Sequence, residues 1–246
     1  MSLSSTGLLT IADDLIVKNA GTIGTAADSD LLTMGNAILT VAGEVSMTTL
    51  DIGGTNVTST ATELNQLDGV VAKTAGKETI WVPAAAMYPS TTNPCADLAQ
   101  VETTALRPDL KVLDFATGAD EFAQFSIAFP KSWNEGTVTF QPFWTVTGTN
   151  TGTVAWQLGG VAMSSDDTIN TAFGSLVATT ALAHSGSSND LMVSVESGAV
   201  TIAGSPAVGD CCFFQINRDV GADDQTGDAR LIGIKLYFTT DAANDA

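Results

Sequence analysis

The chain contains one histidine, His184, within the segment AHSGS at residues 183–187. A histidine that contacts a serine and is oriented by an acid can act as the general base of a nucleophilic triad. The spacing shows no such set, and the glycine and serines around His184 are typical of a loop. We therefore expect a solvent-exposed loop histidine, no catalytic residue and, without a phosphate-binding or His/Cys metal motif, no cofactor.

Four aspartates lie close together in residues 219–228: Asp219, Asp223, Asp224 and Asp228. Carboxylates interspersed with glycines can wrap a hard cation such as calcium, which takes oxygen ligands. The spacing does not match the calcium loop of an EF-hand. A solvated hairpin loop without metal is the favoured interpretation, and a calcium site is the alternative.

The three cysteines, Cys95, Cys211 and Cys212, are too few and too unevenly spaced for a disulfide framework. Adjacent residues on a strand point to opposite faces, so at most one of Cys211 and Cys212 can line a core. We expect buried thiols rather than metal ligands.

The composition favours a β-rich structural protein over a helical enzyme. Charged residues make up only 15% of the 246 residues, and the formal net charge is −18. A surface this acidic repels nucleic-acid phosphates, so nucleic acid is excluded as a partner, and it disfavours binding to anionic membranes. No apolar run has the roughly 18 residues that a membrane helix needs, and the N-terminus lacks a basic, apolar targeting signal.

The sequence changes character near residue 77. The ten Phe, four Trp and two Tyr residues all lie from Trp81 onward, and residues 1–76 contain none of them. A segment without aromatic residues cannot build a dense core of its own. We therefore predict two domains, an N-terminal attachment and stalk segment at residues 1–76 and a C-terminal head at residues 77–246.

The N-terminal segment has an imperfect repeat, because LLTI at residues 8–11 recurs as LLTM at residues 31–34. Strand-like alternation continues through Val41, Val45, Met47, Leu50 and Ile52 to the pair Gly53-Gly54. Short strands that cannot bury their apolar residues alone are typical of an intertwined fibre stalk. A disordered leader peptide is the alternative.

A short helix is predicted after this pattern. Thr60 and Glu63 form a capping box, and Gly69 is placed to end the helix. Leu64 and Leu67 lie one turn apart on the same face. A helix this short is unstable alone, and its leucines therefore need packing partners. These come either from two sister chains around a threefold axis or from the following domain.

The head is predicted to be an antiparallel β-sandwich or jelly roll of around eight short strands. Apolar and aromatic residues alternate over residues 125–129, 138–146, 154–158, 191–195, 200–202, 211–216 and 231–238. Pro142 predicts an edge or a bulge in its strand. Residues 93–106 are expected to form a short helix or a docked loop. Trp133, Trp144 and Trp156 are candidates for stacking on sugars, although tryptophans of a sandwich usually belong to the core.

The segment ATELNQLDGV at residues 61–70, with the preceding residues 50–60, resembles the "ATELNxLDGV" segment of virion fibres of tailed phages, especially marine ones. The likeness covers about a tenth of the chain. It implies a homotrimer, an N-terminus attached to other proteins of the virion and an exposed C-terminal domain. Since no targeting signal is visible, we expect this virion protein to be assembled in the host cytoplasm. It carries over no receptor-binding residues.

Three functions remain open. The first, towards which the motif leans, is a tail fibre whose head binds a host cell-surface glycan or protein. The second is a capsid head fibre or decoration protein. The third is an envelope-degrading enzyme, which would need two carboxylates facing across a groove and has no supporting motif.

Overall fold

The computed structural model describes residues 2–3, 9–10, 21–23, 32–35, 38–41, 44–65 and 76–241. The chain divides into two compact units, residues 1–70 and residues 71–246. The sequence placed this boundary at 76/77. Among the described residues, no helix is long and apolar enough to cross a membrane.

The described part of the N-terminal unit consists of short hairpins and one helix. Its elements are β1 (Ser2–Leu3), β2 (Leu9–Thr10), β3 (Gly21–Ile23), β4 (Leu32–Gly35), β5 (Ile38–Val41), β6 (Leu50–Ile52), β7 (Thr55–Val57) and α1 (Ala61–Asn65). Strands β3, β4 and β5 form one antiparallel sheet, and β6 pairs with β7. The β6–β7 turn is Gly53-Gly54, and both glycines have positive φ values, which only glycine adopts easily.

The predicted capping box begins helix α1. The Thr60 backbone N–H donates to the Glu63 carboxylate at 2.7 Å, and the Glu63 N–H donates to the Thr60 hydroxyl at 3.2 Å. The hydrogen bonds that the Thr60 N–H and the Thr60 hydroxyl donate to the Glu63 carboxylate lower the pKa of Glu63. The predicted end of the helix at Gly69 lies outside the described residues.

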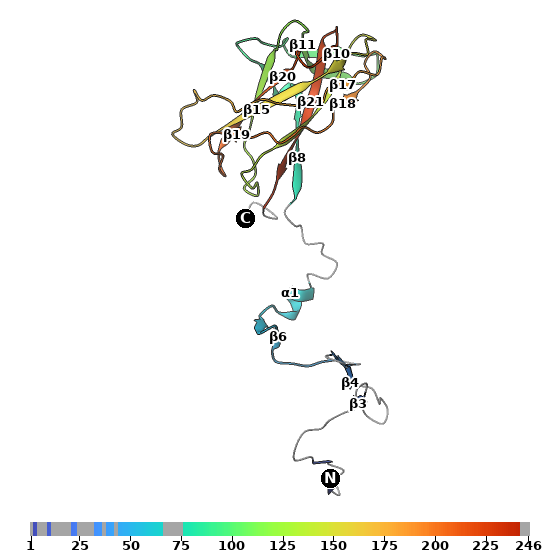
Figure 1. The fold of residues 1–246 in the computed structure, drawn as a ribbon, viewed down its shortest axis with the longest axis vertical. Helices are drawn as coiled ribbons and strands as arrows, with labels where there is room; N and C mark the ends of the chain where they lie inside the picture. Colours follow the sequence, from blue (N-terminus) through green and yellow to red (C-terminus); the bar gives the residue numbers. More distant parts are fainter. Residues whose placement is uncertain are drawn as a thin grey trace. The chain divides into compact units, whose positions relative to one another are not determined.

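The head is a sandwich of two mainly antiparallel sheets (Figure 1). The first sheet contains β10 (Ala99–Glu102), β11 (Asp109–Phe115), β21 (Ala229–Thr239), β13 (Thr139–Thr145) and β18 (Met192–Val193), with β8 (Lys77–Pro83) also paired to β21. The second contains β16 (Val177–Ala178), β15 (Trp156–Met163), β20 (Cys211–Arg218), β12 (Phe122–Ile127) and β9 (Tyr88–Pro89), with β19 (Ile202–Ala203) parallel to β15. The remaining elements are the turn η1 (Ala84–Ala86) and the paired strands β14 (Thr153–Val154) and β17 (Leu182–Ala183).

Aromatic side chains from both sheets fill the core. Phe115 of β11 packs edge to face on Trp156 of β15, with their ring centroids 5.1 Å apart. Phe125 stacks on Phe214 with a centroid distance of 5.2 Å. Phe129 stacks on Trp133, with their ring centroids 4.2 Å apart, and packs edge to face with Phe238 at a centroid distance of 5.5 Å. The alternation that predicted the strands is therefore an alternation between this core and the outer faces.

Two local expectations have clear outcomes. Pro142 predicted an edge or a bulge in its strand, and the β13–β21 register does shift next to it, between Phe143 and Trp144. The helix suggested for residues 93–106 is wrong, because this segment contains strand β10. The part before β10 is a docked loop, with Cys95 buried and the Ala96 N–H donating to the Asp114 carbonyl at 2.9 Å.

The start of the first described strand of the head, β8, and the end of the last, β21, lie at the same end of the sandwich. The Thr240 N–H donates to the Gly76 carbonyl at 2.8 Å, and Trp133 forms a β-bridge with Thr240. The opposite end is formed where Phe115 pairs with Ala229, at the start of β21. Gly76 and Thr240 therefore lie at the same end of the head.

We expect residues 76–246 to fold without the N-terminal unit, because every residue of the buried core cluster lies between Val82 and Phe238. Deleting residues 1–75 should leave the midpoint of thermal unfolding unchanged when followed by tryptophan fluorescence, since all four tryptophans belong to the head. Loss of cooperative unfolding in the truncated protein would contradict the division into two units.

Candidate ligand-binding groove

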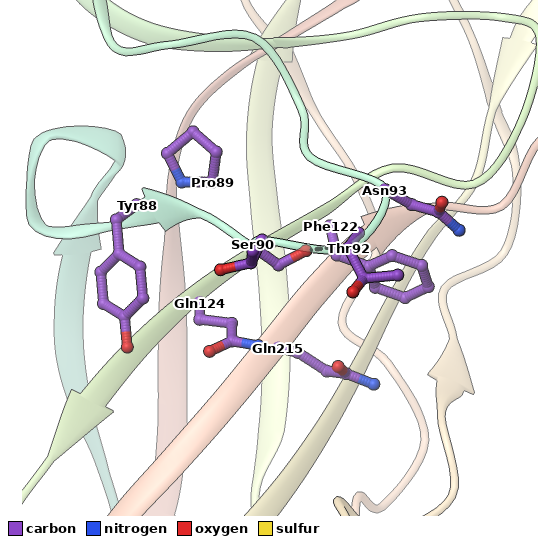
Figure 2. Close-up of a pocket in the computed structure, with 9 residues that line it drawn as sticks. Tyr88, Pro89, Ser90, Thr92, Asn93, Phe122, Gln124 and Gln215 are labelled. Atoms are coloured by element: carbon purple, nitrogen blue, oxygen red, sulfur yellow. Dashed lines mark hydrogen bonds between the residues drawn. The ribbon is translucent and has the colours of Figure 1, made fainter.

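A row of three side chains crosses the outer face of the second sheet. In the strand register, Tyr88 of β9 lies opposite Gln124 of β12, and Gln124 lies opposite Gln215 of β20. The neighbours of Gln124 and Gln215 on their strands, such as Phe125 and Phe214, point into the core. Strand alternation therefore directs the two amides outward together with Tyr88 (Figure 2).

The segment after β9 closes one side of this row. The Ser90 N–H donates to the Phe122 carbonyl at 2.9 Å, and the Phe122 N–H donates to the Asn93 carbonyl at 2.8 Å. Asn93 has a φ of 50°, a left-handed conformation that asparagine tolerates better than most residues and that turns the chain back towards β12. These bonds fasten the loop to the start of β12.

The loop and the row enclose a groove of about 410 Å³, which lies within the range of roughly 300–1,000 Å³ for small-ligand sites. Tyr88 is 49% exposed, and the two glutamines are partly buried. Among the described residues, neither the Gln124 nor the Gln215 side chain has a hydrogen-bond partner. The groove thus presents one aromatic ring and two uncommitted amides, which can both donate and accept.

The tryptophans proposed as sugar-stacking residues are core residues. Trp144 and Trp156 are fully buried, and Trp133 is 1% exposed. The Trp144 Nε1–H donates to the Ser194 hydroxyl at 3.0 Å. The exposed tryptophan is Trp81 on the first sheet, whose ring meets Phe143 edge to face at 5.2 Å. All three residues therefore have the core role expected of tryptophans in a sandwich, and none is exposed for stacking on a sugar.

The acidic segment 219–228 folds around the positively charged side chain of Arg218. The Arg218 side chain is fully buried, and its Nε–H and one Nη2–H donate to the two Asp223 carboxylate oxygens at 2.6 and 2.9 Å. Its other N–H groups donate to the carbonyls of Phe115, Gln225 and Gly227 at 3.2, 2.5 and 2.9 Å. All five guanidinium donors are therefore satisfied, as a buried charge requires.

The structure does not bring the four calcium candidates together. Asp219 accepts a hydrogen bond from the Gln157 amide at 2.6 Å, while Asp224 accepts from the Thr153 N–H and hydroxyl at 2.5 and 2.8 Å. These last two bonds lower the pKa of Asp224. Asp223 is held by Arg218, and Asp228 is exposed. Within the described part of the chain, no group of three or more His, Cys, Asp or Glu side chains is arranged to hold a metal ion.

His184 is buried, which corrects the expectation of an exposed loop histidine. It is 3% exposed, its Nδ1 lies 3.1 Å from the Asn150 carbonyl oxygen, and its ring centroid lies 6.1 Å from that of Trp144. The Ser185 hydroxyl donates to Asp190 at 2.7 Å instead of to the imidazole. The histidine therefore belongs to the packing at this corner and forms no triad with its neighbouring serine.

The cysteine pair behaves as its strand position predicts. Cys212 is buried in the core and Cys211 is exposed. Burial raises the pKa of both Cys95 and Cys212 to about 12, so these two thiols stay protonated at neutral pH.

Leu64, a predicted trimerisation residue, is 42% exposed in the single chain. It lines a hollow of about 670 Å³ within the N-terminal unit, together with the apolar residues Val45, Met47, Leu50 and Val57. The other predicted trimerisation residue, Leu67, lies outside the described residues.

The groove residues were not identified from the sequence, although part of the signal was present. The alternation that assigns Phe125 and Phe214 to the core also places Gln124 and Gln215 on the opposite faces of their strands. The sequence does not reveal that these two strands pair in this register or that Tyr88 joins them.

No protein-family model and no curated protein matches the chain. Among solved structures, it is similar to the carbohydrate-binding module CBM27-1 of Caldicellulosiruptor saccharolyticus in complex with mannohexaose (9% identity, 64% of this chain and 96% of that chain, TM-score 0.36). It is also similar to a family 11 carbohydrate-binding module of Clostridium thermocellum in complex with a mixed-linked tetrasaccharide (8% identity, 67% and 96%, TM-score 0.35). A protein of unknown function from Shewanella oneidensis matches with 10% identity over 78% of this chain and 99% of that chain (TM-score 0.24). At these TM-scores the likenesses assign neither a ligand nor an activity to this chain.

The arginine cluster yields a stability prediction. Asp223→Ala should lower the free energy of unfolding by roughly 3–5 kcal/mol, because it leaves the buried Arg218 charge without its carboxylate. Urea unfolding followed by tryptophan fluorescence measures this change. The control Asp228→Ala, at an exposed aspartate of the same loop, should change the free energy by less than about 0.5 kcal/mol. Equal effects of the two substitutions would contradict the assignment.

Proposed function

We propose that this chain is a fibre protein of a tailed bacteriophage particle, attached by its N-terminal unit and binding a host-surface glycan through its β-sandwich head. The observation that carries this proposal is the row of Tyr88, Gln124 and Gln215 in an open groove. An exposed aromatic ring offers a flat apolar surface for a sugar ring, and free amides offer donors and acceptors to its hydroxyls.

The position of the groove within the head supports adhesion. The groove lies at the start of β12, and the chain then runs on to Trp133, which bridges Thr240 beside Gly76. The polar residues of the groove therefore lie away from the end at which the chain enters the head. A receptor site on a fibre head is best placed there, because the entry end leads to the attachment segment.

The N-terminal unit supports the fibre assignment. The segment that resembles phage fibres includes α1, and four apolar residues around the nearby hollow, Val45, Met47, Leu50 and Leu64, are 41–53% exposed. Such a set of exposed apolar residues is typical of a surface that another chain covers. We propose that two sister chains cover it in a homotrimer.

The second candidate, a capsid head fibre or decoration protein, draws on the same apolar hollow, which would then contact the shell. The third candidate, an envelope-degrading enzyme, has no support from the groove, whose lining contains no Asp or Glu. Glycoside hydrolysis generally uses two carboxylates across the scissile bond. Binding without cleavage is the function that this groove supports best.

Binding of the full-length chain to an array of neutral bacterial surface oligosaccharides tests the adhesion proposal. Tyr88→Ala and Gln215→Ala should each weaken binding about tenfold, because each removes one ligand contact from the row that lines the groove. The matched control is Trp81→Ala, which removes an aromatic ring of similar exposure from the other sheet and should leave binding unchanged.

Bacterial envelopes treated with periodate, which cleaves sugar diols, should lose the chain's binding, whereas protease-treated envelopes should retain it. Binding that survives periodate but not protease would identify a protein receptor and overturn the glycan assignment. Loss of binding in Trp81→Ala alone would move the site to the other sheet.

The trimer proposal predicts that Leu64→Asp shifts the chain from three times its monomer mass towards the monomer in light scattering after gel filtration. The cause is a charge placed in an apolar contact between chains. Thr62→Asp is the control, because Thr62 lies in the same helix but does not line the hollow. A wild-type chain that is monomeric, or a Leu64→Asp variant with the wild-type mass, would contradict the trimer.

A further inference from the structure

The ligand groove continues beyond its polar half into a second, chemically different half. A hollow of about 270 Å³ shares Tyr88 and Gln124 with the first groove. Its six other lining residues are Thr171 and five apolar residues, namely Val161, Met163, Ile169, Phe173 and Phe213. The two halves therefore meet at the tyrosine and form one amphipathic groove.

The strand register explains this division. Gln215 faces outward from β20, and so does Phe213, two residues earlier on the same strand. Phe213 lies opposite Val161 of β15, and Met163 follows two residues further along β15. The side chains on the outer face of the sheet thus change from polar to apolar over two residues of β20, from Gln215 to Phe213.

The segment after β15 forms the outer wall of the apolar half. It carries Ile169, which is 75% exposed, and the partly buried Phe173. The segment lies close on the sheet, because a Cβ at Gly159 would come within 2.9 Å of the Gly174 carbonyl oxygen. Glycine at position 159 therefore permits this wall to pack on β15.

Neither half of the groove contains a charged side chain. The lining residues of both hollows include no Asp, Glu, Lys or Arg, although the chain carries 27 acidic and 9 basic residues. An anionic sugar would lose hydration here without gaining a cationic partner, and it would approach a protein with a formal charge of −18. The groove therefore selects uncharged ligands.

We infer that the ligand is a neutral oligosaccharide in which a hydroxyl-rich sugar is joined to one that bears a methyl group, as a 6-deoxy or an acetyl substituent. This inference rests on the proposed glycan-binding function. The hydroxyl-rich sugar lies over Tyr88 and bonds to the amides of Gln124 and Gln215. The methyl group lies in the apolar half between Phe213 and Ile169, where its removal from water stabilises the complex.

The test compares the affinity of the full-length chain for matched ligands by calorimetry. One pair is a neutral O-antigen oligosaccharide before and after mild alkaline removal of its O-acetyl groups. The other pair is a rhamnose-containing and a mannose-containing oligosaccharide of the same length, which present a 6-deoxy and a 6-hydroxyl position. The methyl-bearing member of at least one pair should bind about fourfold or more tightly, as expected for burying one methyl group.

Three variants separate the two halves of the groove. Ile169→Ser, at an exposed loop position that does not threaten folding, and Phe213→Ser should remove the preference for the methyl-bearing member while retaining binding of the methyl-free one. Gln215→Ala should weaken both members of a pair by the same factor. Val195→Ser is the control, because Val195 is 57% exposed and lies outside both halves.

The outcomes distinguish this inference from the proposed function. Equal affinity within both pairs, with Gln215→Ala weakening all four ligands, would overturn the methyl subsite and leave glycan binding in place. Tighter binding of a uronic-acid oligosaccharide than of any neutral one would overturn the choice of an uncharged ligand. No binding of any oligosaccharide would overturn both proposals.

Discussion

The buried Arg218 guanidinium is the interaction on which the arrangement of the head depends. Arg218 is the last residue of β20, a central strand of the second sheet. Its guanidinium donates hydrogen bonds to the Phe115 carbonyl on the first sheet and to Asp223 and Gly227 in the loop that leads into β21. A charge with no exposed surface is tolerated only if every donor is paired, so this loop has little freedom to adopt another conformation. The cluster lies at the end of the sandwich opposite Gly76, beside the start of β12, where Phe122 of the polar half of the groove pairs with Asn217. Of the four aspartates that suggested a metal loop, Asp223 forms an ion pair with Arg218 instead.

With β20 held in this way, strand alternation assigns its residues to two tasks. Cys212, Phe214 and Ile216 fill the core, while Phe213 and Gln215 face the groove. The same residues that make the sandwich stable therefore set the spacing of the groove side chains. Charged residues are absent from the groove lining, and the groove consequently differs from the strongly acidic chain around it.

Local patterns in the sequence predicted the features that depend on neighbouring residues. The all-β sandwich, most of its long strands, the capping box at Thr60, the bulge near Pro142 and the opposite orientations of Cys211 and Cys212 all follow from spacing of a few residues. The burial of His184, the partner of Asp223 and the row of Tyr88, Gln124 and Gln215 depend on which strands pair and in which register. Those contacts join segments far apart in the chain, and no local pattern specifies them. The tryptophans show the same limit, because their type permits either a core or a sugar-binding role and only the pairing of the sheets decides between the two.

A cryo-EM reconstruction of phage particles adsorbed to the envelope of their host, at a resolution that places the head of this chain, tests the proposed tail-fibre function. We expect the chain to project from the tail and the outer face of the second sheet, with Tyr88, to contact density of the envelope. A chain fixed on the capsid shell, or a head that turns the Trp81 face to the envelope and leaves the Tyr88 groove empty, would contradict the proposal.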